Sequence, residues 1–178
     1  MNYKMMGKFI SQILFVEAAF MLPALLISTL ERNIPAMWGF ALSIVITAAA
    51  ALVLYLFCRH AVRRFYAREG LVCVGMSWIF LSLMGCLPFF LSGEIPNYLD
   101  ALFEIVSGFT TTGASILSNV EGLSKGMLYW RSFSHWLGGM GVLVFLLAVG
   151  TKGDKGSGFT LHLLRAESPG PTVGKLVP

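Results

Sequence analysis

The chain has 178 residues, of which 56% are hydrophobic and only 12% are charged. A soluble domain usually carries about 25% charged residues, so this composition indicates a membrane protein. The formal net charge of +4 is small, and the basic residues lie at the ends of apolar runs, which argues against a nucleic-acid-binding surface.

The first unit, residues 1–69, predicts two transmembrane helices. The first candidate span covers 9–30 and the second covers 37–57, each close to the roughly 20 residues that cross a hydrocarbon core of about 30 Å. Glu17 lies in the middle of the first span, where a carboxyl group is costly unless it faces protein. It can be a cation-pathway carboxylate or a partner in an inter-helix hydrogen bond. We expect the hydrogen bond, because nothing in the sequence pairs Glu17 with the polar segments further on.

A basic segment, 58–70, follows the second span and contains four arginines. Short loops rich in arginine and lysine face the cytoplasm. We therefore expect this segment on the cytoplasmic side, and with it the N-terminus that carries Lys4 and Lys8. The protein is then a multi-pass protein of the cytoplasmic (inner) membrane.

The second unit, residues 70–150, begins and ends with a candidate span. The third span covers 71–91 and is expected to bend near Gly85 and Pro88. The fourth covers 127–149 and carries the run Gly-Gly-Met-Gly at 138–141. Missing side chains there let a neighbouring backbone approach closely.

Between these spans, residues 98–108 have the apolar periodicity of a helix. At 1.5 Å per residue this helix is roughly 16 Å long, about half of the membrane core. Asn97 is expected to cap its start, and Gly108 is expected to supply the left-handed residue at its end. The chain must therefore enter the membrane and turn back.

The half-helix runs into 110–115, with the sequence Thr-Thr-Thr-Gly-Ala-Ser. Threonine offers a hydroxyl as well as a carbonyl, and Gly113 permits backbone angles that other residues resist. Carbonyl oxygens in a selectivity filter replace the hydration shell of a monovalent cation, so this segment is a candidate ion filter. The same residues also fit an ordinary Thr/Gly loop, and the residues alone leave both interpretations open.

The remaining polar residues give no indication of an enzyme active site, and we expect a protein that is not an enzyme. Arg131 can form a salt bridge that steadies the pore mouth or can anchor in lipid headgroups, and we weigh the two equally. His135 is expected to be a hydrogen-bond partner rather than a metal ligand. Glu17, Glu104 and His135 show no spacing typical of acid–base or metal chemistry. The three cysteines are scattered in or beside apolar segments, which predicts reduced packing residues rather than disulfides.

Four blocks of sequence carry a family resemblance. They are Asp-Ala-Leu-Phe-Glu at 100–104, Ser-Gly-Phe-Thr-Thr-Thr-Gly-Ala at 107–114, Trp-Arg-Ser at 130–132 with Trp-Leu-Gly-Gly-Met-Gly at 136–141, and Arg-Ala-Glu-Ser-Pro-Gly-Pro at 165–171. In order and spacing, these blocks resemble the Trk/Ktr/HKT superfamily of potassium transporters, most closely its bacterial TrkH/TrkG-type pore subunits.

The resemblance implies an all-α integral membrane fold that is potassium-channel-like. Two leading transmembrane helices precede four repeats of helix, pore half-helix, filter and helix. This chain would supply the leading pair and one repeat, followed by a cytoplasmic connection, 151–178, towards a missing second repeat. We therefore expect the N-terminal portion of a longer subunit. The gating loop and the pore-facing arginine of the family belong to later repeats.

The resemblance also implies the function and its residues. The transported ion is K⁺, held mainly by the backbone carbonyls of Thr111, Thr112, Gly113 and Ala114, with the two threonines favoured and no bound cofactor. The implied partners are membrane lipid, a second copy of the full-length subunit, and a cytosolic NAD- or ATP-binding TrkA-type regulatory subunit. Channel-like transport and coupling to protons or sodium both remain open.

An alternative function is a membrane fragment with a structural or regulatory role and no transport of its own. Expression of residues 1–178 alone in a strain without potassium uptake separates the two hypotheses. Rescue of growth at low potassium would require transport by the chain itself.

Overall fold

The protein, seen in a computed structural model, is described for residues 3–59 and 67–150, and within these ranges residues 67–71 and 142–150 are described by their backbone alone. The elements are α1 (Tyr3–Leu30), α2 (Ile34–Cys58), α3 (Ala67–Gly85), α4 (Leu87–Leu91), α5 (Tyr98–Phe109), the 3₁₀ turn η1 (Val120–Gly122) and α6 (Lys125–Gly150). The described part contains helices and no strands, which confirms an all-α fold.

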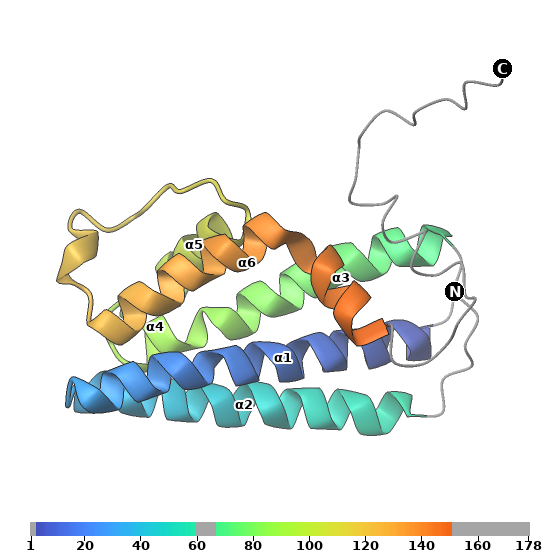
Figure 1. The fold of residues 1–178 in the computed structure, drawn as a ribbon, viewed down its shortest axis with the longest axis horizontal. Coiled ribbons are helices and arrows are strands. Elements are labelled where there is room, and N and C mark those ends of the chain that lie inside the picture. Colours follow the sequence, from blue (N-terminus) through green and yellow to red (C-terminus); the bar gives the residue numbers. More distant parts are fainter. Residues whose placement is uncertain (1–2, 60–66, 151–178) are drawn as a thin grey trace, which may run out of the picture.

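The two leading helices form an antiparallel hairpin (Figure 1). The turn between them places Arg32 in a left-handed conformation, with φ of 57°. The side chain of Asn33 then accepts a 3.2 Å hydrogen bond from the amide of Ala36 and caps α2. Pro35 follows in the first turn of α2, where its missing N–H has no intrahelical acceptor to lose.

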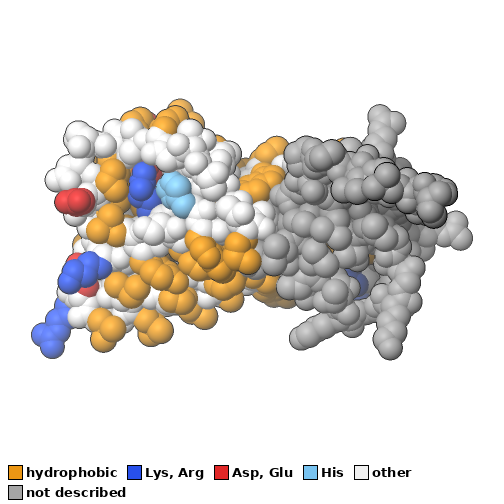
Figure 2. Space-filling model, turned by 45° about the horizontal axis from the view of Figure 1, so that its top comes forward, with side chains coloured by type: hydrophobic (Ala, Val, Ile, Leu, Met, Phe, Trp, Pro, Cys, Tyr) orange, Lys and Arg blue, Asp and Glu red, His pale blue; other side chains and the backbone are white. Residues whose placement is uncertain are grey.

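Within the described residues, three helical stretches are long and apolar enough to cross a membrane: Tyr3–Leu30, Ile34–Cys58 and Val72–Leu91. The surface of α2 is apolar on several sides, with exposed Trp38, Leu42, Val45, Ile46, Leu52, Val53 and Leu56. Figure 2 shows hydrophobic side chains over much of the described surface, whereas most visible charged groups lie towards the end that carries the α1–α2 turn. A helix that is apolar all round is typical of a lipid-embedded segment, so the protein is a multi-pass membrane protein.

The third span is interrupted as predicted. Helix α3 ends at Gly85, and α4 starts at Leu87 with Pro88 in its first turn. The indole N–H of Trp130 on α6 donates a buried 2.9 Å hydrogen bond to the carbonyl of Gly85. This bond joins α6 to the point where the third span changes direction.

The fourth candidate span, 127–149, lies within α6, which contains a break that the sequence analysis did not predict. Helix α6 is broken at Gly141, whose φ of 72° and ψ of 151° are not helical. A side chain at this φ would be strained, so the break needs a glycine. In Figure 1 the backbone after the break turns away from the axis of the first part of α6.

Buried side chains from several helices pack together between the hairpin and the α5–α6 pair. The largest include Met21, Phe40, Phe89, Ile105 and Trp130. The three cysteines, Cys58, Cys73 and Cys86, are buried and free, which confirms their prediction as packing residues.

The proposed unit boundaries at 69/70 and 150/151 are not tested by this structure. The middle of the basic segment, 60–66, and the connection over 151–178 lie outside the described residues.

Candidate functional site

Helix α5 starts where the sequence predicts. The side chain of Asn97 accepts a 3.0 Å hydrogen bond from the amide of Leu99, and Asp100 lies in the first turn, beside the positive end of the helix dipole. The helix has 12 residues, Tyr98–Phe109, one more than expected, and is about 18 Å long at 1.5 Å per residue. It is too short to cross the membrane core of about 30 Å.

The end of α5 differs from the prediction. The amides of Thr111 and Thr112 donate to the carbonyls of Gly108 and Ser107 at 2.9 and 3.0 Å, which is the pattern of a Schellman cap. The left-handed residue of this cap is Thr111, with φ of 56°, and the expectation that Gly108 fills this role is wrong. Because Thr111 is β-branched, its left-handed backbone is unusual.

Gly108 lies inside α5 because of its packing against α6. A methyl group built on Gly108 would overlap the hydroxyl of Ser134 and lie 3.5 Å from Nδ1 of His135. Gly108 is therefore required by the contact between two helices, which local sequence patterns do not reveal.

A second glycine contact joins the same two helices, and here the glycine belongs to α6. A methyl group built on Gly138 of α6 would overlap the carbonyl group of Phe109, the last residue of α5. The adjacent Gly139 has more room, with Cγ2 of Thr111 at 3.9 Å as the nearest atom. Close backbone approach at the glycine run of α6 is thus confirmed, and it depends on Gly138.

The segment 110–115 follows α5 and is exposed and non-helical. Gly113 has a φ of 73°, which confirms that this position uses the conformational freedom of glycine. The hydroxyls of Thr110 and Thr112 are 2.8 Å apart, and the hydroxyl of Thr111 donates to the carbonyl of Thr110 at 2.7 Å. The four predicted ligands, Thr111 to Ala114, are thus consecutive and exposed; their role as ion ligands stays a prediction.

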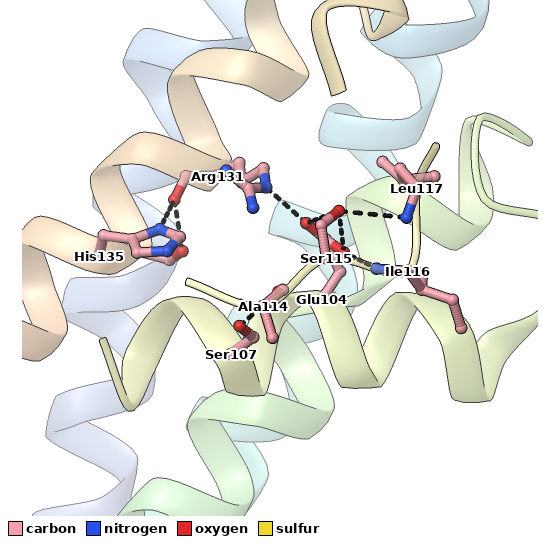
Figure 3. Close-up of polar contacts among 9 residues, drawn as sticks. Glu104, Ser107, Ala114, Ser115, Ile116, Leu117, Arg131 and His135 are labelled. Atoms are coloured by element: carbon pink, nitrogen blue, oxygen red, sulfur yellow. Dashed lines mark hydrogen bonds and ion pairs between the residues drawn. The ribbon is translucent and has the colours of Figure 1, made fainter. Parts of the chain in front are cut away.

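Two residues of α5 bind the chain directly after Gly113 (Figure 3). Ser107 donates a 2.5 Å hydrogen bond to the carbonyl of Ala114. One turn earlier, the carboxylate of Glu104 accepts from the hydroxyl of Ser115 at 3.0 Å and from the amide of Ile116 at 3.1 Å. The chain after Gly113 therefore runs back alongside the half-helix and is fastened to it at successive residues.

The carboxylate of Glu104 also binds the following helix. Nε of Arg131 donates to it at 2.5 Å. The side chain of Glu104 is 0% exposed and that of Arg131 is 17% exposed. Of the two roles considered for Arg131, the structure favours the salt bridge. The carbonyl of Arg131 lies 2.9 Å from Nδ1 of His135, so His135 is a hydrogen-bond partner, as expected.

Sequence reasoning missed Glu104, Ser107 and Ser115 as parts of the site. A signal was present for Glu104, because it shares one helix face with Ala101, Ile105 and Gly108, which are all buried. A carboxylate on a buried face needs a charged or hydrogen-bonding partner, and Arg131 lies near the start of the fourth candidate span, 127–149.

The structure does not show the inter-helix hydrogen bond that we expected for Glu17. The side chain of Glu17, on α1, is buried, and neither carboxyl oxygen has a hydrogen-bond partner among the described residues. A methyl group built on Gly85 would lie 2.8 Å from Oε1 of Glu17 and 3.2 Å from side-chain atoms of Ile105 and Phe109. The carboxyl group of Glu17 therefore lies at the end of α3, close to side chains in the C-terminal half of α5.

Comparison with known proteins adds the family. The family model TrkH, described as a cation transport protein, matches residues 37–175. The chain is 35% identical over 182 residues to the Trk system potassium uptake protein TrkH of Halomonas elongata, a match that covers 100% of the chain and 36% of that relative. It is 38% identical over 109 residues to the Trk system potassium uptake protein TrkG of Escherichia coli, covering 58% of the chain and 21% of the relative.

An uncharacterized cation transporter of Methanocaldococcus jannaschii is 43% identical over 74 residues, which are 42% of the chain and 16% of the relative. The chain thus spans 36% of the length of the Halomonas protein, and less of the other two.

Proposed function

Since the chain belongs to the TrkH family of cation transport proteins, we propose that it is the part of a potassium uptake protein that carries the leading helices and the first filter segment. Members of this family are transporters and not enzymes. The single observation that carries the proposal is the exposed segment 110–115, which leaves the end of a half-helix with left-handed backbone at Thr111 and Gly113.

In this proposal the protein selects potassium by replacing its hydration shell with oxygen atoms. The ligands are mainly the backbone carbonyls of Thr111, Thr112, Gly113 and Ala114, with the two threonines favoured. The carbonyl of Ala114 already accepts from Ser107, but a carbonyl oxygen has two lone pairs, and the second one is available to an ion. No covalent chemistry is involved.

The remaining parts of the filter would come from the rest of a longer protein. One segment supplies one quarter of a ring if the protein has four repeats, as the resemblance implies. We propose the cytoplasmic membrane as its location, with the N-terminus in the cytoplasm, because the basic segment 58–70 and the lysines before the first span favour that side. A second copy of the subunit and a TrkA-type regulatory subunit that binds NAD or ATP are proposed partners.

The proposal is testable in a chimaera. Residues 1–178 replace the aligned part of the Halomonas elongata protein, and the chimaera is expressed in a strain that lacks potassium uptake. We expect growth at low potassium and uptake of potassium in preference to sodium. A chimaera that is present in the membrane but does not transport would contradict the proposed function and favour the non-transporting alternative.

Gly113 provides the residue-level test, with Gly93 as its matched control. Both glycines have positive φ, 73° and 78°, and a methyl group built on either would meet no atom within 4 Å. Gly113→Ser and Gly93→Ser therefore each place a side chain at a similar positive φ with open space around it, and of the two only Gly113 lies in the candidate filter. We expect Gly113→Ser to raise sodium uptake about tenfold relative to potassium, an energy difference of ~1.4 kcal/mol. Unchanged selectivity would remove Gly113 from the filter.

A further inference from the structure

The carboxylate of Glu104 joins three parts of the molecule. It belongs to α5 and is 0% exposed. It accepts hydrogen bonds from Ser115 and Ile116, which follow the filter segment, and from Arg131 on α6. Figure 3 shows these groups converging on one carboxylate.

We propose that Glu104 is a positioning residue for the filter, which holds the downstream end of the segment 111–114 in the geometry that selects among cations. Arg131 completes the arrangement by neutralising the buried carboxylate. This inference rests on the proposed function, because a position for the filter matters only where the segment binds ions.

The hydrogen bonds of Ser107 and Glu104 restrict the movement of the chain after Gly113. Carbonyl ligands discriminate between cations of different size only when neighbouring parts of the chain keep them in place. Ala114 is held by Ser107, and the next two residues are held by Glu104. The chain between Gly113 and Ile116 is otherwise exposed, so these bonds limit how far the carbonyls at 113 and 114 can move.

The buried carboxylate of Glu104 is paired with the charge of Arg131. Hydrogen bonds to an ionised group are stronger than bonds between neutral groups, and a buried carboxylate without a cation is costly. Arg131 supplies the cation from a different helix. The position of the filter segment therefore depends on the position of α6 through Glu104. The structure shows no direct bond between Arg131 and Ser115, so Glu104 is the link between them.

The test compares variants of the chimaera. Glu104→Gln keeps the size of the side chain and one carbonyl oxygen, but it loses the charge that Arg131 requires. Ser115→Ala removes a single hydroxyl that bonds Glu104. Ser118→Ala is the control, because Ser118 is an exposed serine in the same loop. Potassium and sodium uptake are measured for each variant, with maximal rate and apparent affinity determined separately.

We expect the preference for potassium over sodium to fall about tenfold in Glu104→Gln and about threefold in Ser115→Ala, in proportion to the hydrogen bonds lost. Ser118→Ala should keep the original preference. A purely structural role for Glu104 would lower the amount of protein or the maximal rate for both ions equally, without changing the ratio. An unchanged ratio in Glu104→Gln would therefore overturn the inference.

A double-mutant cycle tests whether Arg131 acts through Glu104. Ser115→Ala and Arg131→Met each remove one partner of the same carboxylate. If both act through Glu104, their effects on the selectivity ratio should not add, and the double variant should differ little from Arg131→Met alone. Additive effects would show that the two residues act independently and would contradict the proposed arrangement.

Hydrogen exchange provides a measurement that does not require transport. The amide of Ile116 donates to Glu104, whereas the amide of Leu123 donates to the carbonyl of Val120. In the purified chimaera, Glu104→Gln should accelerate exchange in peptides that cover 114–117 and leave peptides that cover 120–124 unchanged. Unchanged exchange at 114–117 in Glu104→Gln would contradict the positioning role, even if the unmodified chimaera failed to transport and the proposed function was lost.

Discussion

Gly138 on α6 lies directly against the carbonyl of Phe109, the last residue of α5, so that no side chain fits between the two. This contact determines how closely α5 approaches α6 just before the chain enters the candidate filter segment, 110–115. The neighbouring Gly139 has its nearest atom, Cγ2 of Thr111, at 3.9 Å from a built methyl group. Two adjacent glycines therefore differ in what they permit, and their alanine variants form a matched pair.

We expect Gly138→Ala to displace the end of α5 and Gly139→Ala to be tolerated. Overpacking of a tight contact costs roughly 1–3 kcal/mol, whereas alanine in place of a helical glycine that has space gains about 1 kcal/mol. Thermal unfolding of the purified chimaera should thus show a lower Tm for the first variant and an equal or higher Tm for the second. Equal Tm values for both variants would contradict the contact with Phe109.

The contact between Gly108 and Ser134 predicts a rescue. A methyl group built on Gly108 would overlap Oγ of Ser134 but lie 3.1 Å from its Cβ. Gly108→Ala should therefore destabilise the protein by roughly 1–3 kcal/mol, and the added Ser134→Ala change should restore part of the loss. Ser134→Ala alone provides the baseline, because it removes the bond from the hydroxyl to the carbonyl of Arg131. A double variant less stable than Gly108→Ala alone would contradict this prediction.

Thr111 predicts an unusual gain from glycine. A left-handed conformation costs a residue with a side chain roughly 1–2 kcal/mol, and Thr111 has a φ of 56°. Thr111→Gly should remove this strain and raise the Tm, while Thr112→Gly should lower it, because glycine adds freedom to the unfolded chain. The comparison requires only thermal unfolding of the two variants. A fall in Tm of the same size for both would rule out strain at Thr111.

Glu17 and Glu104, the glutamates that are buried in the described part of the chain, predict opposite effects of the same substitution. Glu17 has two carboxyl oxygens without a hydrogen-bond partner among the described residues, whereas Glu104 binds Ser115, Ile116 and Arg131. Replacement of Glu17 by Met removes an unpartnered polar group, worth about 1–3 kcal/mol, and should stabilise the protein. Glu104→Met leaves Arg131 without its anion and should destabilise it by roughly 3–5 kcal/mol.

Chemical or thermal unfolding of the two variants in the same detergent checks this prediction. Destabilisation by Glu17→Met comparable to that by Glu104→Met would show that Glu17 has a partner in the complete protein. Transport assays on Glu17→Met then separate its effect on stability from any effect on ion selectivity.

The parts of the fold that could be predicted from the sequence depend on local chemistry. Apolar runs of about 20 residues predict spans because the membrane core requires that length. Asn97 identifies the start of α5, because an amide side chain can satisfy the free N–H groups of the first turn. The composition of 110–115 predicts an open segment with a glycine at positive φ, and Gly113 has that conformation. Each of these features depends on residues within a few positions of one another.

The contacts between α5 and its neighbours, in contrast, follow from the packing of helices that are distant in the sequence. Gly108 and Gly138 are needed where α5 and α6 approach each other, and the left-handed conformation falls on Thr111 instead. Arg131 is 27 residues from Glu104 in the chain but shares its carboxylate, whereas Glu17 has no such partner among the described residues. Which buried groups meet depends on the packing of whole helices, and single-sequence periodicity does not contain the distances between them.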